Sequence, residues 1–223
     1  MTQQHDDLYT DEKHAILEAA LIEADFDGFS LQTLRRAADK AGVSRDMQRL
    51  AFPRGVMDLV AYYSKSADQA MLEGLKAQDI SSLKVREKIA LAVRLRIEAL
   101  AAHKPAARRA VQFLTLPQFA PEGLRNLYRT VDAIWRAIGD TSTDFNFYTK
   151  RALLAGVYTS TLMRWFEDTS EDSRATWEFL SARIENVMQI EKAKAAAKRA
   201  MEKMPSPLSV LNKVRERARA DRP

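Results

Sequence analysis

Residues 30–55, SLQTLRRAADKAGVSRDMQRLAFPRG, carry the strongest local folding signals in the chain. Ser30 stands where a helix would begin, and its hydroxyl can accept a hydrogen bond from a backbone N–H of the first turn. Gly42 stands where that helix would end, because glycine readily takes the left-handed conformation that follows a helix. Ser44 predicts a second N-cap, and the helix it begins must end before Pro53. The stretch therefore predicts two short helices joined by a tight turn.

Helical patterning continues on both sides of this stretch, with apolar residues at intervals of three and four. The chain has 223 residues but only seven Gly and seven Pro, so few positions favour tight turns. Pro105 suits the first turn of a helix, where its missing N–H costs no hydrogen bond. We therefore expect an all-α protein with further helices at 11–24, 56–77, 84–102, from 105 until Pro117, and from 121 onward.

Composition excludes several classes of protein. The absence of cysteine excludes thiol catalysis, zinc thiolate sites and disulfide frameworks together. Charges interrupt every apolar run before it reaches the roughly 18 to 20 residues that a bilayer span requires. We therefore expect a soluble or peripheral protein.

The net charge of +5 is unevenly distributed along the chain. Residues 1–55 hold seven Lys or Arg against ten Asp or Glu, residues 56–190 hold eighteen against sixteen, and residues 191–223 hold ten against four. The tail thus accounts for the basic character. We expect three parts with these boundaries: an N-terminal helix-turn-helix-like element, a helical domain and a basic tail.

The string AADKAGVS at 37–44, followed by a short helix and FPRG, resembles the helix-turn-helix of TetR-type transcription regulators. DNA affinity depends mainly on cations that meet phosphates, yet this part of the chain is net acidic. The would-be recognition helix offers Arg45, Gln48 and Arg49, but also Asp46. We expect a helix-turn-helix that is retained without nucleic-acid binding. A ligand-responsive DNA-binding regulator of TetR type is the alternative.

Residues 117–190 carry a more specific resemblance. The distinctive strings are GDTSTDFNFYTKRALLAGVY at 139–158, EDTSED at 167–172 and TWEFL at 176–180. They resemble the C-terminal domain of the lipid-binding family of ubiquinone (coenzyme Q) biosynthesis, which is known for a TetR-like fold. The resemblance implies a TetR-like helical bundle, a likeness that also makes a homodimer plausible. It further implies a non-enzymatic protein that holds an isoprenoid or quinone lipid in an apolar cavity and presents it to a membrane-associated di-iron hydroxylase.

Site residues follow from this resemblance by position. The contact surface for the hydroxylase falls on Ile134, Asp144, Phe147 and Tyr148, and Arg151 matches an arginine near the lipid head group. The family commonly has Trp where this chain has Phe147 and Met where it has Ile134, and both changes preserve apolar bulk. Candidates for the cavity lining are apolar: Leu114, Leu116, Leu153, Leu154, Val157, Leu162, Met163 and Trp165.

The residues around Tyr148 are also unusual on physical grounds. Thr143 can cap a helix whose first turn carries Phe145, Phe147 and Tyr148 in four positions, more directions than one buried stripe absorbs. Exposed aromatic rings suit a protein contact, because they anchor interfaces at low entropic cost. A buried cluster of three aromatic residues is the alternative.

The basic tail predicts a C-terminal amphipathic helix. Pro205 ends an Ala, Lys and Glu-rich stretch that can prolong the preceding helix, and Ser206 with Pro207 begins a new helix to about residue 219. Its membrane-binding residues would be Leu208, Leu211, Val214, Lys213, Arg215, Arg217 and Arg219. The alternative is a solvated basic tail or a helix that packs on its own domain.

The start of the chain bears on location. Residues 1–15 are acidic, whereas secretory and mitochondrial targeting segments are basic or poor in acids. We expect a cytoplasmic bacterial protein peripheral to the inner membrane, or a processed organellar one on the matrix side of the mitochondrial inner membrane.

No arrangement typical of an enzyme emerges. The only histidines are His5, His14 and His103, and no Glu-x-x-His pair of a di-iron bundle occurs. Phosphate-binding loops and a Ser, His and Asp set are also missing. We expect no catalytic residue, metal or cofactor, and we interpret the acids of EDTSED as a solvated helix junction that caps the following helix.

Overall fold

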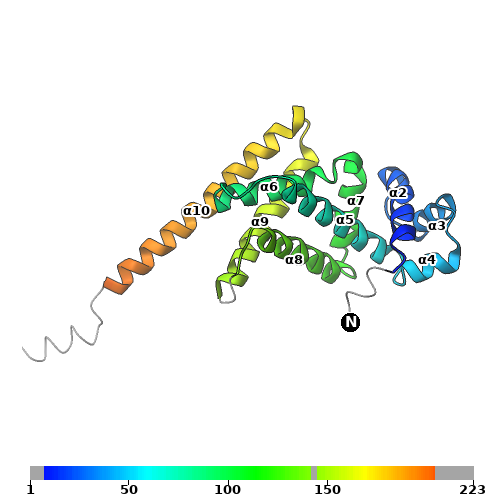
Figure 1. Ribbon diagram of the computed structural model, residues 1–223, viewed down its shortest axis with the longest axis horizontal. Coiled ribbons are helices and arrows are strands. Elements are labelled where there is room, and N and C mark those ends of the chain that lie inside the picture. The colour runs from blue at the N-terminus through cyan, green and yellow to red at the C-terminus, as the bar shows by residue number, and fades with distance from the viewer. Residues whose placement is uncertain (1–7, 142–144, 204–223) are drawn as a thin grey trace, which may run out of the picture. The chain divides into compact units, whose positions relative to one another are not determined.

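The structure is a computed structural model that describes residues 8–141 and 145–203. Every regular element in these two ranges is helical (Figure 1). The all-α prediction is therefore confirmed for the described part of the chain. Its division into two compact units falls after Ser181, so residues 182–203 are described separately from the helices before them.

The N-terminal helices are α2 (Thr10–Asp27), α3 (Leu31–Lys40) and α4 (Arg45–Ala51), which lie together in Figure 1. The hydroxyl of Ser30 accepts a hydrogen bond from the N–H of Thr33 at 3.0 Å, and Ser44 accepts one from the N–H of Met47 at 3.2 Å. Gly42 has a φ of 68°, the left-handed conformation expected after a helix. The predicted helix-turn-helix geometry is confirmed.

The body of the first unit is formed by the helices that follow: α5 (Val56–Lys76), α6 (Val85–Glu98), α7 (Lys104–Thr115), α8 (Ala120–Ala137) and α9 (Phe145–Glu167). Helix α5 packs against α6 and α8, and α8 also packs against α7 and α9. Large side chains without solvent exposure, including Leu59, Met71, Ile97 and Ile134, fill the space between them. Their burial supplies the main favourable term in folding.

The segment before Pro105 differs from the predicted helix at 84–102. Helix α6 ends at Glu98, and a 3-10 turn follows at Ala101–His103. The chain turns at His103, whose φ of −130° and ψ of 53° are not helical, and α7 begins at Lys104 with Pro105 in its first turn, where the missing N–H costs no hydrogen bond. The carboxylate of Asp25 accepts hydrogen bonds from the N–H of Ala106 and from Nδ1 of His103, each at 2.9 Å. It thereby attaches α2 to the start of α7.

The acidic junction after α9 is solvated only in part: Glu167, Glu171 and Asp172 are exposed as predicted, whereas Asp168 is not. Asp168 is buried, and its carboxylate accepts hydrogen bonds from the N–H groups of Ser170 at 2.8 Å and Thr176 at 2.7 Å, and from both hydroxyls. These bonds from Ser170 and Thr176 hold the pKa of Asp168 well below its usual range. The carboxylate therefore joins α9 to α10 (Arg174–Lys203) as an internal brace.

The stretch from Ile190 prolongs the preceding helix as predicted, because α10 continues to Lys203. The predicted amphipathic helix at 205–219, with its membrane-facing residues, lies outside the described residues, and its membrane role stays a prediction. Among the helices at 8–141 and 145–203, none has an apolar length sufficient to cross a bilayer.

Candidate ligand-binding cavity

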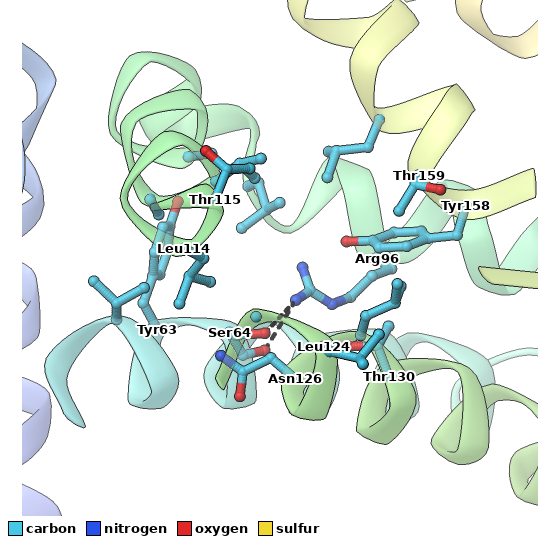
Figure 2. A pocket seen from close by; sticks show the side chains of 18 of the residues that line it. Tyr63, Ser64, Arg96, Leu114, Thr115, Leu124, Asn126, Thr130, Tyr158 and Thr159 are labelled. Atoms are coloured by element: carbon cyan, nitrogen blue, oxygen red, sulfur yellow. Dashed lines mark hydrogen bonds between the residues drawn. The ribbon is translucent and has the colours of Figure 1, made fainter. Parts of the chain in front are cut away.

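A cavity of about 440 Å³ lies between helices α5 to α9 of the first unit (Figure 2). Its size falls within the usual range for small-molecule sites. Most of its lining is apolar, and helices far apart in the sequence contribute to it. The lining residues are Val60, Tyr63, Ser64, Arg96, Leu100, Ala107, Ala110, Val111, Leu114, Thr115, Ala120, Gly123, Leu124, Asn126, Leu127, Thr130, Tyr158, Thr159, Leu162 and Met163.

The cavity reaches the protein surface at an apolar rim. Leu124 of α8 is 69% exposed and Met163 of α9 is 44% exposed, yet both belong to the lining. Other lining residues, such as Val60 and Tyr158, are buried. The cavity thus extends from an apolar mouth into the core, a shape that suits a long apolar ligand.

Arg96 is the only charged residue among those that line this cavity, and it is only 3% exposed. Its Nε donates a hydrogen bond to Oδ1 of Asp68 at 2.6 Å. Its Nη2 donates to the carbonyl and hydroxyl of Ser64 at 3.0 and 3.2 Å (Figure 2). Thr130 of α8 donates to the same Asp68 oxygen at 2.8 Å. Burial opposes the charged form of Arg96, but the nearby Tyr158 and Asp68 raise its pKa above the ordinary value.

Three polar atoms of the lining residues have no hydrogen-bond partner although they are buried. They are Oη of Tyr63, Nη1 of Arg96 and Nδ2 of Asn126. Burial raises the pKa of Tyr63, so its hydroxyl remains protonated and can donate. Three residues of the lining thus carry a buried donor without a partner, which is uncommon in folded proteins.

The predicted lipid-binding residues are only partly brought together. Leu162 lines the cavity, as do Leu114 and Met163 from the wider set of candidates. Arg151, Leu153, Leu154 and Val157 do not belong to the lining, and neither do Leu116 and Trp165. Since α9 presents only one side to the cavity, the residues that line it recur at 158, 159, 162 and 163.

Arg151 is buried in a different place. Its guanidinium pairs with Asp132 of α8 at 2.7 Å and with Asp140 at 3.5 Å, and it donates to the carbonyl of Phe147 at 3.2 Å. The side chain therefore joins the start of α9 to α8. The head-group role that the resemblance implied for it is not supported by this cavity.

The predicted contact surface for the hydroxylase is partly an error. Ile134 has no solvent exposure, because it lies on the same buried stripe of α8 as Val131, so it is a core residue. Tyr148 is 68% exposed, and the ring of Phe147 lies edge-on to it with centroids 5.1 Å apart. Tyr148 is thus no part of a buried aromatic cluster. Thr143, Asp144 and the side chain of Phe145 lie outside the described residues.

Arg96, Asp68, Tyr63 and Asn126 were missed from the sequence. A usable signal was present, since Arg96 follows Ala92 and Val93 by four and three positions and so falls on their buried face. A charged residue on an apolar stripe requires a buried partner. That partner, Asp68, lies 28 positions earlier and shares the buried stripe of α5 with Met71 and Leu75.

Comparison with known proteins agrees with this architecture. Residues 120–191 match the family model described as COQ9. The chain is 30% identical over 196 residues to the ubiquinone biosynthesis protein COQ9, mitochondrial, of Rattus norvegicus, covering 84% of this chain and 63% of that protein. It is 29% identical to the Homo sapiens protein of the same name, with 84% and 62% covered, and 34% identical to COQ9-B of Xenopus laevis, with 78% and 61% covered. The chain thus spans slightly less than two thirds of the length of these relatives.

A solved structure supports the fold. The crystal structure of a TetR transcriptional regulator from Nitrosomonas europaea superposes with a TM-score of 0.64 at 23% identity, covering 77% of this chain and 95% of the other. This likeness concerns the fold alone. Taken together, the matched C-terminal segment and the relatives show that the chain resembles the COQ9 family of ubiquinone biosynthesis proteins, and the solved structure shows that it has a TetR-like fold.

Proposed function

We propose that this protein takes part in ubiquinone biosynthesis by holding an isoprenoid or quinone lipid in the cavity that helices α5 to α9 line. The observation that carries the proposal is the cavity itself, about 440 Å³ in volume and lined mostly by apolar side chains. Its relatives are named as ubiquinone biosynthesis proteins. Their mitochondrial names also support the second of the two locations that the sequence leaves open.

The exposed rim suggests how a lipid would enter. Large apolar side chains that are exposed to water often mark a binding site. Leu124 and Met163 are two such side chains, and both lie at the cavity mouth. A lipid that leaves a bilayer at this mouth would exchange one apolar surrounding for another. The basic tail at 191–223 would attract an anionic membrane surface in the same process.

A second element of the proposal is presentation of the lipid to a membrane-associated di-iron hydroxylase. Tyr148 offers an exposed ring for such a contact, and Phe147 supports it from the side. The buried Arg151 holds the first turn of α9 in place through Asp132 and Asp140. Ile134 is no longer part of this surface, because it lies in the core.

The alternative function, DNA binding of TetR type, fits the charges less well. Cations of the helix-turn-helix-like element pair with neighbouring acids: Arg45 with Asp39, Arg49 with Asp46, and Lys40 with Glu23. A phosphate would have to compete with each of these carboxylates. These ion pairs therefore favour the lipid-binding proposal over DNA binding.

Native mass spectrometry of the purified full chain, together with a mobility-shift assay on random duplex DNA, tests the proposal. We expect bound lipid to accompany the protein and the DNA to remain unshifted at moderate salt. Salt-sensitive DNA binding by a protein that carries no lipid would favour the regulator instead.

A further inference from the structure

We infer that a second pocket, lined by helices α2, α4, α5 and α8, binds a small molecule in which an aromatic ring carries a dianionic group such as a phosphate. The pocket has a volume of about 380 Å³, within the usual range for small-molecule sites. It shares no lining residue with the cavity that α5 to α9 line. On α5, Tyr63 lines that cavity whereas Tyr62 and Lys65 line this pocket, because they lie on the opposite side of the helix. The inference is therefore independent of the proposed function.

The charges of the lining favour an anion. Four cationic side chains and two carboxylates line the pocket: Lys13, Arg54, Lys65 and Arg129 against Asp58 and Glu122. The lining thus has a formal charge of +2. Arg54 binds both carboxylates, since its Nε donates to Oδ1 of Asp58 at 2.7 Å and its Nη1 donates to Oε2 of Glu122 at 3.1 Å. The two acids are therefore already paired, and the remaining charge of the lining matches a dianion.

Arg129 is the side chain best placed to bind that anion. Among the described residues it donates only to neutral groups, namely the carbonyl of Ala61 at 3.5 Å and Oδ1 of Asn126 at 2.7 Å, both through Nη2. Its Nη1 has no hydrogen-bond partner within residues 8–141 and 145–203 and still contacts solvent. Because a guanidinium stays charged and matches the geometry of phosphate oxygens, Arg129 offers a charged donor that a ligand in the pocket can reach.

The cations lie along one seam, where α5 packs against α8. Arg54 binds Asp58 on α5 and Glu122 on α8, whereas Arg129 of α8 binds the carbonyl of Ala61 on α5. Ala61 follows Asp58 by three residues, and Lys65 follows Ala61 by four. Each interval is about one helical turn, or about 5.4 Å along the axis. A single small ligand can therefore contact more than one of these cations.

The rest of the lining suits a planar ring. Phe52 and Tyr62 both line the pocket, and their rings meet edge to face with centroids 6.1 Å apart. Aromatic walls favour stacked or edge-on contacts with another ring. The pocket is accessible, because Leu50 in its lining is 54% exposed, and it reaches the core, because the neighbouring Ala51 is buried.

Four compounds test this class of ligand by isothermal titration calorimetry of the full chain at pH 8. Phenyl phosphate has both the ring and a dianion, since the second pKa of a phosphate monoester is about 6. Methyl phosphate lacks the ring, benzoate has one negative charge, and benzyl alcohol has none. We expect phenyl phosphate to bind most tightly, methyl phosphate about three- to tenfold more weakly through loss of the ring contacts, and benzyl alcohol most weakly.

Two variants test the cations. Arg129→Gln removes the charge but keeps an amide that can donate to Asn126, and it should weaken phenyl phosphate binding about tenfold, the effect of one lost hydrogen bond to a charged group. Lys65→Gln should also weaken binding. The matched control is Arg136→Gln, which makes the same change of charge on α8 at a side chain that is 72% exposed and does not line the pocket. Thermal melting followed by circular dichroism verifies that each variant is folded.

Several results would overturn the inference. Binding of phenyl phosphate no tighter than that of benzyl alcohol would exclude an anion site, and equal binding of benzoate and phenyl phosphate would exclude the preference for a dianion. Equal losses of affinity in Arg129→Gln and Arg136→Gln would show that only the overall charge matters. If Arg129→Gln does not fold, Lys65→Gln provides the same comparison with the control. None of these results bears on lipid binding, because the two sites have separate linings.

Discussion

The guanidinium of Arg151 lies 3.4 Å from the ring centroid of Phe147 and also donates a hydrogen bond to the backbone carbonyl of the same residue at 3.2 Å. One side chain thus fixes both the ring and the backbone of the first turn of α9. Asp132 binds the other two nitrogens of Arg151, Nε at 2.8 Å and Nη2 at 2.7 Å, and Asp140 lies 3.5 Å from Nη1, the nitrogen that donates to Phe147. As a result, the exposed ring of Tyr148 projects from a rigid turn, which lowers the entropic cost of binding a partner.

This arrangement predicts different effects for the two neighbouring aromatic residues. Tyr148→Lys should weaken binding of the cognate hydroxylase at least about tenfold, as expected for a central interface residue, while leaving the melting temperature nearly unchanged. Affinity would be measured by surface plasmon resonance and melting by calorimetry. The control is Tyr128→Lys, which alters another exposed tyrosine, on α8. Equal binding by both variants would contradict the assignment of Tyr148.

Phe147→Leu should instead lower the free energy of unfolding. The variant loses the contact between the ring and the guanidinium of Arg151, whose worth is about 1 to 2 kcal/mol in a desolvated place. Urea titration followed by circular dichroism measures the change. A variant as stable as the original protein would show that the contact between Arg151 and this ring does not contribute to the free energy of unfolding.

The buried pair of Arg96 and Asp68 makes a sharper prediction about stability. Asp68→Leu leaves the charge of Arg96 unmatched in the core and should lower the free energy of unfolding by about 3 to 5 kcal/mol. The double variant Asp68→Leu with Arg96→Met removes both charges and should recover most of that loss. Urea titrations of both would show this. A double variant as unstable as the single one would contradict the account of the pair.

Acid should weaken the junction between α9 and α10. Hydrogen bonds from Ser170 and Thr176 lower the pKa of Asp168 in the folded state, so its ionised form stabilises the fold fully above its unfolded pKa of about 4. That contribution decreases as the pH falls below about 4 toward the lower folded pKa. Asp168→Asn should therefore reduce the dependence of the melting temperature on pH between pH 5 and pH 3, as scanning calorimetry would measure. If the melting temperature of the variant depends on pH as steeply as that of the original protein, other carboxylates cause the acid sensitivity.

Deletion of residues 205–223 tests the basic tail. The truncated chain should no longer sediment with vesicles that contain anionic lipid, because the predicted amphipathic helix and its cations are removed. It should still bind as much of the neutral apolar dye Nile red as the full chain, since the cavity is built from α5 to α9. If the truncated chain still sediments with the vesicles, another part of the protein binds the membrane.

Local signals in the sequence predicted the fold well. Ser30, Gly42 and Ser44 act within one turn of their own positions, so the helix ends could be assigned without knowledge of the tertiary structure. The resemblance at 139–158 also identified α9 and the exposed Tyr148 correctly. Its transfer of a surface role to Ile134 was wrong, because the spacing from Val131 already assigned that residue to the buried stripe of α8.

The polar part of the cavity could not be predicted in this way. Asp68 and Arg96 lie 28 positions apart on different helices, so the apolar stripe that carries Arg96 indicates a buried charge but does not identify its partner. Only the packing of α5 against α6 brings them together. The same limitation affected Asp168, whose acidic neighbours suggested a solvated turn until its bonds to Ser170 and Thr176 were seen.

The central claim is that the cavity between α5 and α9 holds a lipid, and a pair of valine variants tests it most directly. Val111 lines the cavity, whereas Val85 is exposed on α6, so replacement of each by Phe adds the same bulk at different places. Native mass spectrometry would measure the lipid that accompanies each purified protein. Val85→Phe should retain the lipid of the original chain and Val111→Phe should lose most of it; equal lipid content in both variants would contradict the claim.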